Sequence, residues 1–185
     1  KNGSLLVKHH VTAAYGFDVF DIKKAKAAGL YGRGFYFSKD SSQAGVYGKQ
    51  YDVYLNIVNP LQPGAKNLTK DQMLKFINAV ANDEDYGLDN YGQDANPQKV
   101  LNSIWGKDDF SMLQDINATC IGDFASALKL FNRINGTSYD GINTPTETVA
   151  FYPNQIKDIN NLNPTSADSI KFRSRSEERF SRNAE

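Results

Sequence analysis

Short runs in which apolar and polar residues alternate predict β-strands toward both ends of the chain. The clearest run covers residues 51–58, where every second side chain is apolar, and it ends at Asn59-Pro60 because proline cannot donate to a strand ladder. Further short strands are predicted at residues 4–8, 35–37, 138–142 and 147–152. The first of them leads into the pair His9 and His10, which it delivers to an edge or a cleft.

Apolar residues spaced by three and four positions predict a helical block in the middle of the chain. Its first helix spans residues 70–81 and is capped by Thr69. Further helices are predicted at residues 97–105, 110–118 and 123–135, with a short one at residues 21–28 that ends at Gly29. Residues 82–96 show no periodicity and are rich in Asp, Asn, Gly and Tyr, so we expect a mobile acidic loop there.

Strands on either side of a helical middle indicate an α+β fold in a single domain. A chain of 185 residues, 40% of them hydrophobic, can build one substantial core. We place this domain at residues 1–163, with the helical block as an insertion at about residues 66–136. After Asn163-Pro164 the composition shifts to Ser, Arg and Glu, so residues 164–185 are expected to form a charged linker or tail, disordered or leading into a longer protein.

Charge and composition disfavour several classes of function. Lys and Arg together number 21, as do Asp and Glu, so no charge excess favours nucleic acid or a membrane surface. The single cysteine, Cys120, cannot form an internal disulfide and is expected to be a buried structural thiol. His9 and His10 are adjacent and lack further ligands at suitable spacing, so no metal site is expected. No apolar run reaches the roughly 20 residues of a membrane span and no signal peptide is visible, which favours a cytoplasmic protein.

The segment Gly32-Arg33-Gly34-Phe35-Tyr36-Phe37-Ser38 is the strongest candidate for chemistry. Two nearby glycines let a backbone turn tightly and approach a flat ligand, and the aromatic strand behind them offers a ring for stacking. The same pattern also describes an ordinary turn that leads into a buried strand. In the first strand His9 and His10 alternate to opposite faces, and we expect His9 to be structural or exposed.

Five separated segments together resemble the His-Tyr-Glu group of ADP-ribosyltransferases, which includes diphtheria toxin and the poly(ADP-ribose) polymerases. The group's motifs correspond to His10-Val11-Thr12, to Tyr36 within the glycine segment, to Tyr47 eleven residues later, and to Glu147 at the start of a late strand. The runs at residues 56–61, 139–142 and 151–157 are most similar to ADP-ribosyltransferase modules of phage and mobile-element polyvalent proteins. The resemblance covers roughly residues 4–160 and is weakest in the helical block.

The resemblance implies two small β-sheets splayed around an NAD cleft, and an enzyme that transfers ADP-ribose from NAD to another molecule. In such an enzyme Glu147 stabilises the cationic ribose, Tyr36 stacks on the nicotinamide and His10 binds the adenine-side ribose. The implied catalytic residues are therefore Glu147, His10 and Tyr36, and the residues implied to bind NAD are His10, Val11, Thr12, Gly34, Tyr36, Ala44 and Tyr47. NAD enters as a co-substrate, and no metal is implied.

Two departures from the family pattern keep alternatives open. Val11 stands where these enzymes usually have glycine, and Ala44 stands where they usually have a serine that bonds the carboxamide. Pro145, two residues before Glu147, takes the place of the Glu or Gln typical of arginine-modifying toxins, so arginine is a less favoured acceptor. The resemblance implies a mono-ADP-ribosyltransferase that modifies a protein or nucleic acid of a bacterial host, as a phage-encoded protein or a delivered effector. The alternatives are an inactive module that binds NAD, ADP-ribose or a protein, and a toxin that hydrolyses NAD.

Overall fold

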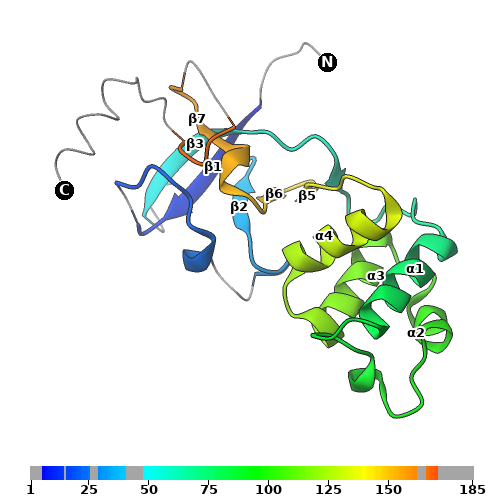
Figure 1. Ribbon diagram of the computed structural model, residues 1–185. Helices are drawn as coiled ribbons and strands as arrows, with labels where there is room; N and C mark the ends of the chain where they lie inside the picture. Colours follow the sequence, from blue (N-terminus) through cyan, green and yellow to red (C-terminus); the bar gives the residue numbers. More distant parts are fainter. Residues whose placement is uncertain (1–5, 15, 26–28, 41–47, 162–165, 171–185) are drawn as a thin grey trace.

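The computed structural model describes residues 6–14, 16–25, 29–40, 48–161 and 166–170 (Figure 1). It confirms the predicted α+β class, because a curled sheet lies beside a group of helices. The strands are β1 (Val7–Thr12), β2 (Phe35–Ser38), β3 (Lys49–Leu55), β4 (Pro60–Leu61), β5 (Gly141–Asn143), β6 (Glu147–Ala150) and β7 (Ile156–Asp158). The helices are α1 (Lys70–Ala81), α2 (Pro97–Ile104), α3 (Asp109–Ile116) and α4 (Phe124–Asn135), with the short turns η1 (Ile22–Lys24), η2 (Asp89–Tyr91), η3 (Asn117–Ile121) and η4 (Pro153–Gln155).

The sheet is continuous but has a weak seam between β1 and β2. Its seven strands follow the order β4-β5-β6-β2-β1-β3-β7, and all neighbours are antiparallel except β4 and β5. β1 pairs with β3 along its whole length, whereas its register with β2 is limited to His9 opposite Ser38. The two small sheets implied by the resemblance are therefore two halves of one sheet, which remain joined at this seam and diverge beyond it.

Each half of the sheet has its own hydrophobic core, and the two cores lie on opposite faces. Phe35 and Phe37 of β2 join Val53 of β3 and Ile156 of β7 in one core. Tyr36 points to the other face, where it packs against the core formed by the four helices and β4 to β6. Because successive residues of a strand point to opposite faces, β2 contributes to both cores. β6 does the same through Val149 and Ala150, so β2 and β6 lie between the two cores.

The helices begin and end close to the residues that the sequence predicts. In α1 the Thr69 hydroxyl accepts from the Gln72 backbone N–H at 3.2 Å, and Gln72 Oε1 accepts from the Thr69 backbone N–H at 2.9 Å. Each of the other helices is capped by an Asn or Asp side chain, namely Asn96, Asp108 and Asp123. These caps satisfy backbone donors that have no partner within the helix, while the apolar faces pack together into one core.

A buried carboxylate ties the start of α3 to the segment that leads into α1. Asp109 is only 1% exposed, and its carboxylate accepts from the backbone N–H groups of Asn67 and Leu68 at 2.8 and 3.0 Å. Its own backbone N–H donates to the carbonyl group of Ala65 at 2.8 Å. A buried carboxylate is stable when hydrogen bonds replace its hydration, so these contacts fix how α3 sits against the entry to α1.

Two segments differ from their predicted form. A helix is predicted at residues 21–28, but the structure has only the single 3-10 turn η1 there. The backbone at Ala25 is already extended, with a ψ of 145°. Residues 26–28 lie outside the described part of the chain. The acidic loop at residues 82–96 contains the turn η2. Asn90 Nδ2 donates to the Thr119 carbonyl group at 2.6 Å and so attaches this loop to the helical block.

Residues 166–170 pack against the sheet, although their composition predicts that they belong to a charged tail. Ile170 is fully buried in the core that contains Phe37 of β2 and Val53 of β3. Lys157 Nζ donates to the carbonyl groups of Ala167 and Ser169. One apolar residue among polar neighbours gives no periodic signal, so only the fold reveals this contact. The rest of the predicted tail lies outside the described residues.

Candidate active site

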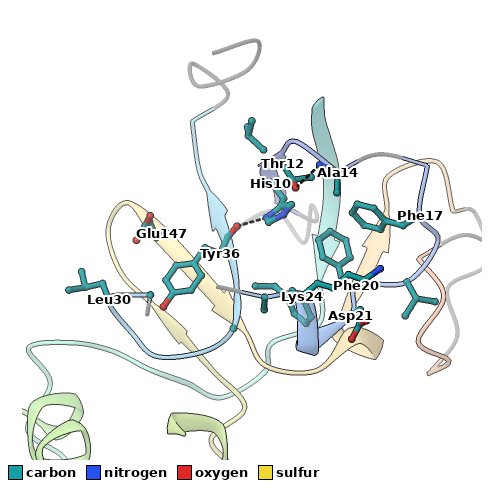
Figure 2. Close-up of a pocket in the computed structure, with 16 residues that line it drawn as sticks. His10, Thr12, Ala14, Phe17, Phe20, Asp21, Lys24, Leu30, Tyr36 and Glu147 are labelled. Carbon is teal, nitrogen blue, oxygen red and sulfur yellow. Dashed lines mark hydrogen bonds between the residues drawn. The ribbon is translucent and has the colours of Figure 1, made fainter. Parts of the chain in front are cut away.

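A pocket of about 660 Å³ opens beside the seam, where β1 and β2 diverge (Figure 2). This volume lies within the roughly 300–1,000 Å³ that small-molecule sites occupy. Of the residues that the sequence analysis predicted to act on or bind NAD, the pocket lining contains His10, Val11, Thr12, Gly34, Tyr36 and Glu147. The two others, Ala44 and Tyr47, lie outside the described residues.

His10 connects the two halves of the sheet through its side chain. Its Nδ1–H donates to the Tyr36 carbonyl oxygen at 2.8 Å, just beyond the point where β1 and β2 stop pairing (Figure 2). Phe20 packs edge-on against the imidazole with ring centroids 5.1 Å apart. Burial lowers the pKa of His10, and the bond to the Tyr36 carbonyl only partly opposes this. The ring is therefore neutral near pH 7, with Nε2 able to accept a hydrogen bond.

Tyr36 presents an aromatic ring whose hydroxyl is already fully engaged. The hydroxyl donates to the Gly32 carbonyl oxygen at 2.6 Å and accepts from the Tyr31 backbone N–H at 2.9 Å. Burial raises the pKa of Tyr36 to about 12; the Tyr31 N–H opposes this shift, and the nearby Glu147 carboxylate adds to it. The phenol therefore stays neutral and anchored, and what it can offer a ligand is the face of its ring.

Two glycines of the turn before β2 make room for side chains of the protein. A Cβ atom at Gly29 would lie 2.2 Å from the Tyr36 hydroxyl oxygen, and one at Gly34 would lie 2.6 Å from a Val149 methyl group. Gly34 also lines the pocket. Close approach to a flat ligand was predicted for Gly32 and Gly34, and it is not needed to explain either of them. Gly32 has a φ of +81° and faces Phe124, and Gly34 packs against β6.

Glu147 stands at the first residue of β6, opposite Ser38 of β2. Its backbone N–H donates to Thr144 Oγ1 at 2.8 Å, and its carbonyl group accepts from the Thr144 N–H at 2.8 Å. Lys39 Nζ donates to the Thr144 carbonyl oxygen at 2.9 Å and fastens the same turn to the end of β2. The backbone of Glu147 is thus fixed, while its partly exposed side chain faces the pocket (Figure 2).

Val11 and Thr12 form the β1 side of the pocket mouth. The Thr12 hydroxyl accepts from the Ala14 backbone N–H at 3.2 Å, so it is partly used within the chain. Val11 occupies the position where the family usually has glycine, and it lines the pocket together with His10. We expect its backbone groups to contact a ligand.

Several pocket residues were not singled out in the sequence. Phe17 and Phe20 form an aromatic floor with ring centroids 5.1 Å apart, and Asp21 and Lys24 add one charge of each sign. The exposed Leu30 lies beside Tyr36 (Figure 2). No periodic pattern distinguishes these residues, because a loop and a single 3-10 turn deliver them to the pocket.

The arrangement suits a ligand that carries an aromatic ring and a sugar with developing positive charge. The Tyr36 ring is held in place, His10 Nε2 can accept from a hydroxyl group, and the Glu147 carboxylate can stabilise a cation. Among the residues that the structure describes, no group of three or more His, Cys, Asp or Glu side chains could hold a metal ion. None of the described helices is long and apolar enough to cross a membrane.

Comparison with known proteins assigns the chain to a family. A family model described as ADP-ribosyltransferase in polyvalent proteins matches residues 1–166. Searches of curated proteins and of solved structures find no match. The matched range includes every strand of the sheet and all described residues of the pocket. The chain therefore belongs to the ADP-ribosyltransferases of polyvalent proteins, a family of transferases that use NAD as substrate.

Proposed function

We propose that this protein is a mono-ADP-ribosyltransferase that breaks the bond between nicotinamide and ribose in NAD and transfers ADP-ribose to a host macromolecule. The observation that carries the proposal is the convergence of Glu147, Tyr36 and His10 on one pocket at the seam of the sheet. These residues come from three different strands, β6, β2 and β1, and Glu147 is more than a hundred positions away from the other two in the sequence. Their presence in one pocket is therefore not explained by a common role in a single strand or turn.

Glu147 is proposed to stabilise the transition state. Breaking the nicotinamide–ribose bond builds positive charge on the ribose, an oxocarbenium-like state of the kind also met in glycoside hydrolysis. A carboxylate beside that charge lowers the barrier, and we assign to it a bond to a ribose hydroxyl as well. Removing such a stabilising group typically costs ~3 kcal/mol or more, which is about two powers of ten in rate.

Tyr36 and His10 are proposed to hold the two ends of NAD. The fixed Tyr36 ring would stack on the nicotinamide, since its hydroxyl is occupied by Gly32 and Tyr31. His10 Nε2 would accept a hydrogen bond from the adenine-side ribose, because Nδ1 already donates within the protein. Around them, the backbone of Val11 would bind the carboxamide of nicotinamide. Thr12, Gly34, Ala44 and Tyr47 complete the proposed NAD site.

The acceptor is proposed to be a protein or a nucleic acid in the cytoplasm of a bacterial host. This part of the proposal rests on the resemblance to modules of phage and mobile-element polyvalent proteins, and we propose that this protein acts as a toxin or an effector. Labelled NAD incubated with the protein and a bacterial lysate should leave ADP-ribose on one or a few species. Identifying the labelled species by mass spectrometry would name the acceptor.

The Glu147→Gln variant tests the site directly. It keeps the size and the backbone contacts of the residue but removes its charge, so nicotinamide release should fall by about 10²-fold or more. Glu84→Gln, in the loop between α1 and α2, is a matched control that removes a carboxylate outside the pocket and should retain wild-type rates. Undiminished nicotinamide release by Glu147→Gln would remove Glu147 from the mechanism.

Calorimetry with NAD separates the proposal from its alternatives. Binding of NAD without release of nicotinamide would favour an inactive binding module, for which the departures Val11 and Ala44 are the motivation. Release of nicotinamide with free ADP-ribose as the final product, and no labelled macromolecule, would indicate an NAD-hydrolysing toxin. Transfer of label to a macromolecule supports the transferase.

A further inference from the structure

Four polar side chains form a row across the sheet, on the face that carries Glu147. Directly paired residues of neighbouring strands lie on the same face, and the register pairs Glu147 with Ser38, Ser38 with His9, and His9 with Asp52. The row therefore runs across β6, β2, β1 and β3. His9 is not among the residues that line the pocket, and it lies on β1, two strands from Glu147 on β6.

His9 is held firmly at one of its two ring nitrogens. Its Nδ1 lies 2.8 Å from Asp52 Oδ1, and Gln50 Nε2 donates to the same carboxylate oxygen at 2.5 Å. Because a carboxylate can only accept, Nδ1 carries the proton. The bonds from His9 and Gln50 lower the pKa of Asp52 against the opposing effect of burial, so this carboxylate remains ionised.

The other nitrogen, Nε2, has no hydrogen-bond partner among the described residues. The hydrogen-bonding directions of the two imidazole nitrogens diverge, so Nε2 is directed away from Asp52 on β3. The His9 side chain is 17% exposed and that of Asp52 is 37% exposed, so solvent or another molecule can reach this pair. With strands about 4.8 Å apart, the backbones of His9 and Glu147 lie roughly 10 Å from each other. The register places both side chains on the same face of the sheet.

We propose that His9, positioned by Asp52, is the base that accepts the proton of an acceptor hydroxyl group. This inference rests on the proposed transferase function. In the step, the bond between ribose C1′ and the nicotinamide nitrogen breaks and the pair of electrons leaves with neutral nicotinamide. The acceptor oxygen forms the new bond to C1′, and its proton moves to His9 Nε2. Asp52 stabilises the resulting imidazolium, as the carboxylate does in His–Asp pairs of hydrolases.

The need for a base indicates the class of acceptor. A carboxylate acceptor carries no proton at neutral pH and needs no base. A hydroxyl group is a weak nucleophile until its proton is removed, and histidine is suited to this task near pH 7. The acceptor is therefore a hydroxyl-bearing group, either a Ser or Thr side chain or a sugar hydroxyl.

Removing the imidazole and supplying it again tests the role of His9. His9→Ala should lower kcat for transfer by about 10²-fold or more while KM for NAD stays within about twofold. Added imidazole should restore part of the lost rate, which a purely structural role would not allow. Asp52→Asn should also lower kcat, without rescue by imidazole. Tyr54→Phe, on the same face of β3, is the control and should behave as wild type.

The nature of the product linkage gives an independent readout. ADP-ribose on a hydroxyl oxygen is an acetal and resists neutral hydroxylamine, whereas an ester to Asp or Glu is cleaved by it. Loss of the label in hydroxylamine would overturn the proposal of a hydroxyl acceptor.

Transfer by His9→Ala at the wild-type rate would overturn the role of His9 while leaving the proposed function intact. Failure of the wild-type protein to release nicotinamide would instead refute the proposed function. A thermal melt of His9→Ala that matches wild type shows that the variant folds, and His9→Gln offers a second test if it does not.

Discussion

The substitution Tyr36→Phe separates the two features of this side chain, its ring face and its anchored hydroxyl. The change removes one oxygen atom, which donates to the Gly32 carbonyl group at 2.6 Å and accepts from the Tyr31 N–H at 2.9 Å. The ring, its position on β2 and its contact with the helical core remain. Any effect therefore reports on the anchoring of the turn at residues 29–32.

The expected loss of stability follows from these two hydrogen bonds. Each contributes about 0.5–1.5 kcal/mol net, so Tyr36→Phe should lower the free energy of unfolding by ~1–3 kcal/mol. Nicotinamide release should fall by no more than about tenfold, since the ring remains available for stacking and a factor of ten corresponds to ~1.4 kcal/mol. Tyr36→Ala removes the ring as well and should reduce nicotinamide release far more strongly.

Urea unfolding and nicotinamide release measure the two effects separately. A third readout is the titration of tyrosine followed by absorbance, in which the group with a pKa of about 12 should be missing from Tyr36→Phe. The raised pKa means that the folded state keeps this proton while the unfolded chain loses it near pH 10. Stability from this group is therefore complete below pH 10 and is lost as the pH rises toward 12.

One result would refute this reasoning about Tyr36. If Tyr36→Phe abolished nicotinamide release as fully as Tyr36→Ala, with unchanged stability, the hydroxyl itself would act on the substrate. Such a result would require the phenol to leave Gly32 and Tyr31 when NAD binds.

Two further predictions concern buried groups outside this ring. Burial lowers the pKa of His10, so the folded state resists protonation of this imidazole. The free energy of unfolding should therefore fall as the pH drops below about 6.5. The affinity for NAD should fall in the same pH range, because a protonated Nε2 can no longer accept a hydrogen bond. Urea titrations at pH 5 and 7 check this, and an equal pH dependence in His10→Asn would contradict it. The substitution Asp109→Asn weakens the two hydrogen bonds to the segment before α1 and should lower the free energy of unfolding by ~1–3 kcal/mol. Urea denaturation measures this loss. Calorimetry should show an unchanged affinity for NAD. A variant as stable as wild type would argue against that anchoring role.

The helical block is the part of the fold whose elements are best predicted from the sequence pattern. Apolar residues at spacings of three and four, with Thr69 as a cap, predict α1 with the bounds that the structure has. The signal is strong because every turn of a helix repeats the same requirement within a few residues. Segment 21–28 lacks such repetition, and its predicted helix is reduced to the turn η1.

The candidate site shows where sequence patterns stop being informative. The motifs around His10, Tyr36 and Glu147 indicated the residues, but not that Tyr36 uses its hydroxyl within the protein or that Gly29 exists to make room for it. His9 was expected to be structural or exposed. Its pairing with Asp52, 43 positions away, depends on the register of β1 and β3, and no local pattern encodes that register.

The sequence by itself determined the α+β class and the helices α1 to α4, and its motifs named the residues proposed for the site, because each depends on short-range periodicity or on recognisable motifs. Only the tertiary structure decided that the sheet is a single one with a seam between β1 and β2, that residues 166–170 complete one of its cores, and that His9 and Asp52 form a pair in line with Glu147. These features are contacts between segments distant in the chain. They are set by the packing of the two cores on opposite faces, which no single segment specifies.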